Sequence, residues 1–177
     1  MQLFLKYFGR IFRRMYLYAL KFGCFYFMQD FVHLHVHTHY SLLDGQASVS
    51  RLVDKAMKDG MKGIAITDHG NMFGIKEFIN YVSKKNKGLA PEERFKPIVG
   101  CEMYVARRGM EKREGKQDQS GWHLIVLAKN EKGYHNLIKL VSRAWTEGYY
   151  MRPRTDRKDL EKYHEGIIAL SACLAGE

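Results

Sequence analysis

The chain has 177 residues, of which 46% are hydrophobic and 27% are charged. This composition suits one folded domain with a hydrophobic core and excludes a largely disordered chain. The formal net charge of +10 favours a polyanionic partner such as nucleic acid. Three cysteines without a regular spacing favour a reducing cytoplasm over a disulfide-stapled secreted protein.

Residues 1–27 differ in composition from the rest of the chain. They mix aromatic with basic side chains, and their longest charge-free apolar stretch, Met15 to Leu20, is too short to span a membrane. The segment also lacks the cleavage site of a secretory signal. One interpretation is an amphipathic helix lying on a membrane surface. The interpretation we favour is an extension, or a wrongly assigned start, upstream of a domain that occupies residues 28–177.

The most distinctive stretch is residues 31–45, which read FVHLHVHTHYSLLDG. Histidines occupy four alternate positions, and side chains two apart in a β-strand project from the same face. A row of neutral imidazoles needs partners, and a transition metal suits them. The pattern therefore predicts a strand over Phe31–Val36 at a metal site, with a histidine-rich surface strand as the alternative. The four histidines are His33, His35, His37 and His39.

After this stretch, helices and strands are predicted to alternate. Hydrophobic spacing and capping residues predict a helix from Ser48 to about Asp59. The later elements are a strand at Gly63–Thr67, a helix at Met72–Lys85, a strand at Ile98–Val105, a polar loop at Arg107–Ser120, a strand at Trp122–Ala128, a helix at Lys132–Thr146, a short helix at Asp156–Tyr163 and a strand at Gly166–Ser171. The two longer helices are expected to bury Phe73, Phe78, Ile79 and Val82, and Leu137, Ile138, Leu140 and Val141, respectively. Such alternation is typical of parallel strands joined by right-handed crossovers.

Candidate metal ligands recur along five of these strands. In barrels of alternating strands and helices, the chemistry lies at the C-terminal ends of the strands. The candidates are His35, His37 and Asp44 after the first strand, Asp68 and His69 after the second, Glu102 on the third, His123 on the fourth and Cys173 after the fifth. Each alone has an ordinary structural explanation, but convergence from five segments favours a metal site.

Taken together, these segments resemble the PHP (polymerase and histidinol phosphatase) domain family. The resemblance rests on the HxHT stretch, ITDHGN, the Glu of GCEMYVA, the His of WHLIVLA and the Cys of LSACLAGE. It is closest to the PHP domains that open the alpha subunits of bacterial DNA polymerase III, which SRAWTEGYYMRPRTD also resembles. The resemblance implies an α/β fold, a partial and distorted TIM-like (β/α)7 barrel truncated at its C-terminal end.

The resemblance also implies a site for two to three metal ions, Zn²⁺ or else Mn²⁺ or Fe²⁺. The ligands carried over by matching motifs are His35, His37, Asp44, His69, Glu102, His123 and Cys173. Two further family ligands belong to an Asp-x-His motif, for which the sequence has no match after Cys173. Asp44 and Glu102 are expected to be catalytic through the metal cluster, and Asp68 to assist by orienting an imidazole.

The implied activity is phosphodiester hydrolysis, as 3′–5′ exonuclease proofreading within a replicative DNA polymerase in the cytoplasm. The implied partners are DNA, the remaining polymerase domains and other replisome subunits, with no membrane involved. This chain by itself lacks the parts needed to polymerise. A basic and aromatic stretch either contacts single-stranded DNA or packs against a polymerase domain. Its candidate DNA-binding residues are Arg143, Tyr150, Arg152 and Arg154. The alternatives for function are a stand-alone PHP-type phosphatase and a metal-stabilised scaffold without catalysis.

Overall fold

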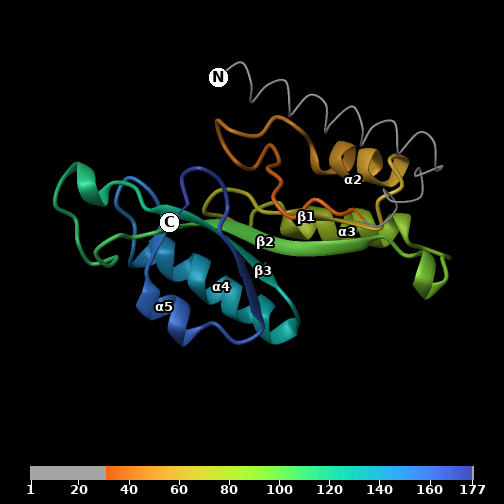
Figure 1. The fold of residues 1–177 in the computed structure, drawn as a ribbon. Coiled ribbons are helices and arrows are strands. Elements are labelled where there is room, and N and C mark those ends of the chain that lie inside the picture. The colour runs from red at the N-terminus through yellow and green to blue at the C-terminus, as the bar shows by residue number, and fades with distance from the viewer. Residues whose placement is uncertain (1–30, 177) are drawn as a thin grey trace, which may run out of the picture. The chain divides into compact units, whose positions relative to one another are not determined.

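One mixed sheet and four α-helices make up the part of the chain that the computed structural model describes, residues 31–176 (Figure 1). In chain order the elements are α2 Val49–Lys58, β1 Gly63–Ile66, α3 Ile75–Lys85, β2 Lys96–Val105, β3 Trp122–Ala128, α4 Glu131–Thr146, β4 Arg154–Thr155, α5 Arg157–Lys162 and β5 Ile167–Leu170. Short 3₁₀ turns lie at Pro91–Glu93 and Lys116–Asp118. The prediction for residues 1–27 falls outside the described residues.

The sheet has the strand order β1-β2-β3-β5, and β4 pairs with β2 beside this path. The pairs β1–β2 and β2–β4 are parallel, whereas β3 runs antiparallel to both β2 and β5. The expected α/β class is confirmed, but the expectation of parallel pairing throughout is wrong for β3. A parallel neighbour needs a long crossover, usually a helix, and residues 106–121 between β2 and β3 form no α-helix. The chain therefore returns directly and β3 runs the other way.

Local signals set the helix ends. The Ser48 side chain accepts a hydrogen bond from the Arg51 N–H at the start of α2, and Asn130 and Asp156 cap α4 and α5 in the same way. The predicted bounds of these three helices are confirmed to within a residue or two. Helix α3 instead begins three residues later than expected, because the Asn71 side chain accepts from the Phe73 N–H and holds a turn there.

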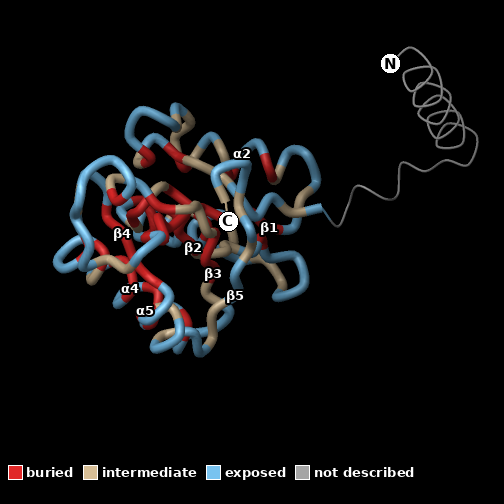
Figure 2. The backbone as a smooth tube through the Cα atoms, turned by 60° about the vertical axis from the view of Figure 1, so that its left-hand side comes forward, coloured by how far each residue is buried: buried red, intermediate tan, exposed pale blue. Residues whose placement is uncertain are grey.

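The helices cover one face of the sheet. Side chains of α2 and α3 pack with Ile64 and Ile66 of β1, and side chains of α4 pack with Cys101, Met103 and Val126. Figure 2 shows buried residues concentrated along the strands. Of the side chains expected to be buried, Phe78, Val82, Leu137, Leu140 and Val141 are buried, whereas Phe73, Ile79 and Ile138 are exposed. Ile79 and Ile138 lie on the outer sides of α3 and α4, and Phe73 lies before α3 begins.

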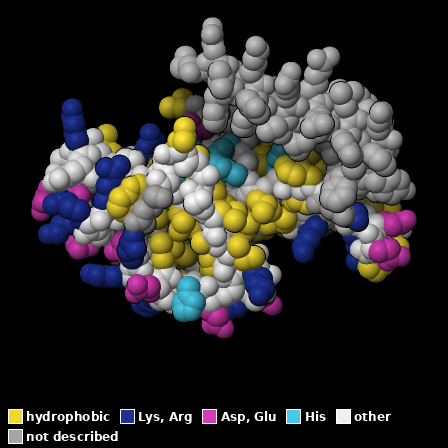
Figure 3. All heavy atoms as spheres, viewed as in Figure 1, with side chains coloured by type: hydrophobic (Ala, Val, Ile, Leu, Met, Phe, Trp, Pro, Cys, Tyr) yellow, Lys and Arg dark blue, Asp and Glu magenta, His cyan; other side chains and the backbone are white. Residues whose placement is uncertain are grey.

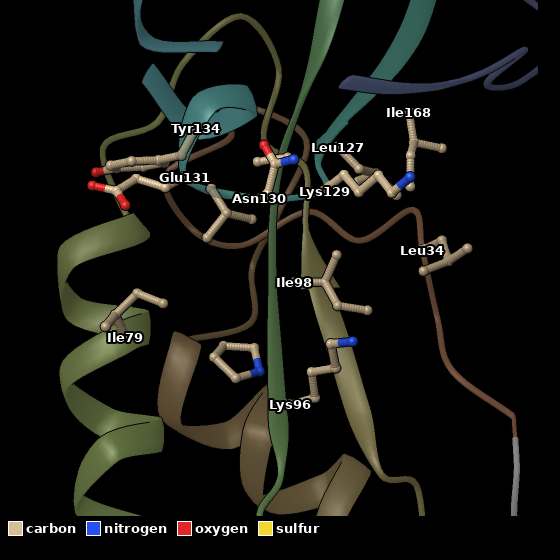
Figure 4. A pocket seen from close by; sticks show the side chains of 13 residues that line it. Leu34, Ile79, Lys96, Ile98, Leu127, Lys129, Asn130, Glu131, Tyr134 and Ile168 are labelled. Carbon is tan, nitrogen blue, oxygen red and sulfur yellow. The ribbon is translucent and has the colours of Figure 1, made fainter. Parts of the chain in front are cut away.

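The opposite face of the sheet carries Ala65, Ile125 and Leu127, as the two-residue period of strands requires. Toward one end it forms an open apolar hollow between Ile98, Leu127, Ile168 and Leu34 (Figure 4). Glu102 shares this face, because it pairs with Ile125 across β2 and β3.

In the face drawn in Figure 3, apolar side chains gather in the middle and charged side chains lie toward the margins. Among the described residues, no helix is long and apolar enough to cross a membrane.

The predicted strand over Phe31–Val36 does not form. The backbone bends at Leu34 and His35 and follows β1 through only a few bonds, from the Ala65 N–H to the His33 carbonyl and from the Thr67 N–H to the Val36 carbonyl. The Val36 N–H would donate to a neighbouring strand in a β-ladder, but here it donates to the Thr67 hydroxyl. The strict alternation expected of the four histidines is therefore lost.

Candidate metal centre

Glu102, in the second half of β2, is the centre of a cluster of histidines. Its side chain is 1% exposed. The Oε2 atom of Glu102 lies 2.8 Å from Nε2 of His35, 2.8 Å from Nε2 of His37 and 3.0 Å from Nε2 of His69. Three imidazoles from two separate segments therefore meet at one buried carboxylate oxygen.

The other oxygen of Glu102 faces a second set of ligand atoms. Its Oε1 lies 2.9 Å from Nδ1 of His123 and 3.8 Å from Sγ of Cys173. His123 reaches this position because β3 runs antiparallel to β2, so that the start of β3 lies beside Tyr104 near the end of β2. The reversed strand, which the sequence did not indicate, is what brings His123 to the site.

The donor atoms form two groups that share Glu102. One group is His35, His37 and Glu102, the other is His69, Glu102 and His123, and within each the donor atoms lie within 4.8 Å of one another. Imidazole nitrogens with a carboxylate oxygen suit Zn²⁺ and also Mn²⁺ or Fe²⁺. The residues present therefore fit two neighbouring metal positions joined by one carboxylate. The Cys173 sulfur, 3.7 Å from Nδ1 of His123, adds a thiol to the second group.

The electrostatics of the cluster favour an ionised Glu102. Burial alone would raise the pKa of Glu102, but its hydrogen bonds with His37, His69 and His35 outweigh burial and hold that pKa far below its ordinary value. Burial would likewise lower the pKa of His69, but Glu102 and Asp44 together raise it. The ionised carboxylate is the form that ligates a metal.

Two of the imidazoles are also held from their other ring nitrogen. Nδ1 of His37 lies 2.9 Å from the Ser41 hydroxyl, which also accepts from the backbone N–H of His69 at 3.1 Å. The Asp44 carboxylate lies in close contact with Nδ1 of His69. Outer contacts of this kind fix the orientation of imidazoles that ligate metals. The role of Asp44 as a ligand stays a prediction, since this contact places it outside both donor groups.

Ser41 is a site residue that the sequence reasoning missed. The available signal was its place in the SLLDG turn, where Leu43 adopts a positive φ of 70° and lets the chain fold back toward His37. A serine four residues after a candidate ligand is too common a pattern to stand out. Only the folded turn shows that its hydroxyl serves both His37 and His69.

Asp68 contacts Thr38, which lies between His37 and His39, rather than an imidazole. Its two oxygens accept hydrogen bonds from the N–H of Thr38 at 2.6 Å and from the Thr38 hydroxyl at 2.9 Å. Burial raises the pKa of Asp68, partly offset by these bonds. The expectation that Asp68 orients an imidazole directly is replaced by a hold on the segment that carries His37.

Of the four histidines predicted to line up at the metal site, two reach the cluster. His35 and His37 join the cluster, whereas His33 and His39 are exposed and belong to neither donor group. The ring of His39 lies instead against Tyr40, with ring centroids 4.3 Å apart. The bend at Leu34 and His35 is the physical reason, because it breaks the alternation that would have aligned all four rings.

Of the candidate DNA-binding residues, Arg152 lies beside the cluster. It is exposed, and its guanidinium lies 5.7 Å from the ring centroid of Tyr104. The Tyr104 ring is stacked on His69, with centroids 5.4 Å apart and planes inclined by 14°. A cation is thus placed next to the donor groups, as contact with a phosphate would require.

Arg154 does not fit a DNA-contacting role, and this prediction is corrected. Its side chain is fully buried, and its guanidinium donates to the backbone carbonyls of Gly148, Lys112, Asp118 and Met110 at 2.7–3.0 Å. Every one of these acceptors belongs to the protein itself. Arg154 therefore pins the loop between β2 and β3 to the segment before β4.

Arg143 and Tyr150 are engaged within the fold. Nε of Arg143 donates to Asp159 at 2.7 Å and its Nη1 to Glu147 at 2.7 Å. The Tyr150 hydroxyl accepts from the N–H of Gly115 at 3.3 Å. Their role toward DNA stays a prediction, and neither lies among the donor groups.

One family model and several curated proteins match the chain. The family model described as the PHP domain matches residues 33–177. DNA polymerase III subunit alpha from Borreliella burgdorferi is 51% identical over 153 residues, and that from Treponema pallidum is 49% identical over 149 residues. These matches cover 85% and 84% of this chain and 12% of each relative, so the chain spans about one eighth of their length. Among solved structures, an amidohydrolase from Chromobacterium violaceum matches 64% of this chain and 36% of its own, with 19% identity and a TM-score of 0.40.

Proposed function

The chain belongs to the PHP domain family, and from that premise we propose that its histidine cluster hydrolyses phosphodiester bonds with bound metal ions. The observation that carries the proposal is the buried Glu102, which faces two donor groups at once. Bound metal ions would supply activation of water and stabilisation of charge on the leaving oxygen. The residues proposed to hold two to three ions, Zn²⁺ or else Mn²⁺ or Fe²⁺, are His35, His37, Asp44, His69, Glu102, His123 and Cys173.

The chain's own residues have distinct parts in this proposal. Glu102 supplies the negative charge between the two groups and keeps both close together. Ser41 and Asp44 hold the rings of His37 and His69 so that their Nε2 atoms face Glu102. Arg152 provides a positive charge at the edge of the site for a phosphate.

We propose further that residues 28–177 are the PHP part of a replicative DNA polymerase, with residues 1–27 as an extension. Support comes from the identity of about one half to the DNA polymerase III alpha subunits of two bacteria. In that setting the activity is 3′–5′ exonuclease proofreading of DNA in the cytoplasm. The partners are then the remaining polymerase domains and other replisome subunits.

A metal-stabilised scaffold is the second candidate, and one observation favours it. The cluster joins side chains from the segment before α2, the loop after β1, strands β2 and β3 and the segment after β5. Metal bound there would hold these segments together whether or not it hydrolysed anything. The two candidates differ only in turnover.

The experiment compares Glu102→Gln with the parent chain, using the full 177 residues purified with Zn²⁺ or Mn²⁺. The substitution keeps the shape of the side chain but removes the shared charge, so metal content and 3′–5′ degradation of a mismatched labelled primer should both fall. We expect degradation to fall at least about a hundredfold, or roughly 2.7 kcal/mol in barrier. The matched control is Glu92→Gln, which changes an exposed carboxylate in the Pro91–Glu93 turn.

Three outcomes separate the candidates. Loss of metal and of degradation in Glu102→Gln alone supports hydrolysis at this site. Bound metal in the parent without any degradation supports the scaffold. Degradation at the parental rate by a folded Glu102→Gln chain that has lost its metal would place the nuclease elsewhere.

A further inference from the structure

Three exposed aromatic side chains lie together beside the metal centre. Phe73, Trp145 and Tyr149 are 62%, 43% and 48% exposed. The rings of Trp145 and Tyr149 are stacked, with centroids 5.6 Å apart and planes inclined by 19°, and the Phe73 ring lies 6.3 Å from that of Trp145. We refer to these three residues as the aromatic shelf. Adjoining exposed apolar side chains of this size commonly mark a binding surface.

The shelf is tied directly to the loop that carries a metal ligand. Trp145, in the last turn of α4, donates from its indole Nε1 to the backbone carbonyl of Gly70 at 2.7 Å. Gly70 follows His69 and has a positive φ of 63°. Its Cα packs so closely on Pro153 that a Cβ there would lie 2.6 Å from the proline ring. The indole therefore has a set position relative to His69 before any ligand arrives.

A single cleft joins the shelf to the metal centre. The cleft, of about 170 Å³, is lined by Trp145 and Tyr149 of the shelf, by Asp44 and His69 of the centre, and by Arg152. A water takes about 30 Å³ in the liquid, so the cleft has room for a ring. A ligand lying on the shelf thus has metal ligands and a guanidinium within the same cleft.

We propose that the aromatic shelf stacks the base of the terminal nucleotide of a single-stranded nucleic acid whose phosphate lies at the metal centre. The proposal rests on the proposed function, because that phosphate belongs to the bond to be hydrolysed. Aromatic faces stack on every base, and a guanidinium pairs with phosphate, so the combination takes a nucleotide without reading its identity. A base in a duplex is already stacked, and the shelf therefore selects an unpaired end.

A neighbouring protein surface is the other conceivable cover for the shelf. The cleft favours the nucleotide, because its walls combine ring faces with Arg152 and with the carboxylate and imidazole of the metal centre. A protein partner would leave Arg152 without a phosphate and would close the route to Asp44 and His69.

The test measures binding of oligothymidylate by fluorescence anisotropy to the full chain loaded with Mn²⁺. The labelled strand carries 3′-terminal phosphorothioate linkages to slow hydrolysis, and a second strand is the same except that its three 3′-terminal bases are missing. Trp145→Ala should weaken binding of the complete strand about 5- to 150-fold, which corresponds to the 1–3 kcal/mol per stacked base. Binding of the abasic strand should change less than about twofold.

Matched variants keep the result interpretable. Tyr134→Ala removes an exposed aromatic ring near the other end of α4 and should leave both affinities unchanged. Trp145→Phe keeps a stacking face and should retain most of the affinity. Tyr149→Ala removes the outer ring of the shelf and serves as the second variant if circular dichroism shows that Trp145→Ala is unfolded.

Equal loss for both strands, or no loss for either, would overturn the proposal, and no loss is what a covering protein partner predicts. The binding readout needs no turnover, so it is separable from the proposed function. A chain that binds through the shelf but degrades nothing refutes hydrolysis alone. If the parent chain degrades DNA while Trp145→Ala and Tyr149→Ala bind both strands as the parent does, the proposal for the shelf alone is refuted.

Discussion

Two stretches of the chain are rich in residues that bind phosphates or metals, and they fold in opposite ways. The stretch at 35–45 turns His35 and His37 toward the buried Glu102 and supports them with Ser41. The stretch at 150–155 turns its central cation, Arg154, into the protein, where four backbone carbonyls surround it. Residue type is therefore a poor guide to role when the direction of the side chain is unknown.

The two stretches fold differently because their side chains find different hydrogen-bond partners within the protein. A row of imidazoles has few partners of its own and gains from a shared carboxylate and metal ions. A guanidinium has five N–H donors in a fixed fork and can saturate several loop carbonyls at once. Arg152, two residues away, remains exposed, and its guanidinium lies over the Tyr104 ring.

The largest expected effect concerns the two inner histidines against the two outer ones. The His35→Ala/His37→Ala chain should lose the metal held by the first donor group, whereas His33→Ala/His39→Ala should keep the metal content of the parent. Structural Zn²⁺ in small sites contributes on the order of 10 kcal/mol to folding, so the loss of an ion should also lower the melting temperature of the inner double variant. Metal content by mass spectrometry and calorimetry would check this, and an inner variant with the same metal content as the parent would contradict the assignment.

Next in size is the contrast between Arg154 and Arg152. Arg154→Met should lower the free energy of unfolding by about 3 kcal/mol, because it leaves the carbonyls of Gly148 and Asp118 buried without this donor, at about 1–3 kcal/mol each. The half-buried bonds to Lys112 and Met110 are lost as well. Arg152→Met should change it by less than about 0.5 kcal/mol, as for other exposed positions. Urea unfolding of both variants measures the difference, and equal effects would contradict a stabilising role for the buried Arg154.

A smaller effect is expected from the residue that supports the cluster from outside. Ser41→Ala removes the hydroxyl behind His37 and the acceptor for the His69 N–H. Changes at such outer contacts cost about 10- to 100-fold in metal affinity. Competition with a fluorescent chelator would measure the loss, with Ser83→Ala, at an exposed position of α3, as control. An affinity equal to that of the parent would mean that the turn alone orients the ring.

The smallest effect concerns the loop that Arg154 pins. Hydrogen bonding from Arg108 lowers the pKa of Asp118, which is a carboxylate with a folded pKa below its unfolded value. Its contribution to stability is therefore present above the unfolded pKa, about 4, and is lost as the pH falls through the folded pKa. Asp118→Asn should flatten the decline of the melting temperature below pH 4, compared with the parent. An unchanged profile would show that the pair is screened by solvent.

Several features of this protein followed from the sequence by itself. Ser48, Asn130 and Asp156 cap helices because a cap bonds to an N–H only two or three residues away, and such contacts depend on the local sequence alone. The identities of five residues in the donor groups were likewise predicted, since histidine and carboxylate at strand ends are unusual without a partner. Membership of the PHP family was predicted from the same motifs and is confirmed.

Other features depended on contacts between distant parts of the chain. The direction of β3, the bend at His35 and the burial of Arg154 each arise from partners tens of residues away, namely β2, Thr67 and the loop carbonyls. The spacing of residues along one segment carries no record of those partners. The tertiary structure alone therefore decided that Glu102 belongs to both donor groups and that Ser41 supports both His37 and His69. It also decided that the aromatic shelf lines the same cleft as Asp44 and His69.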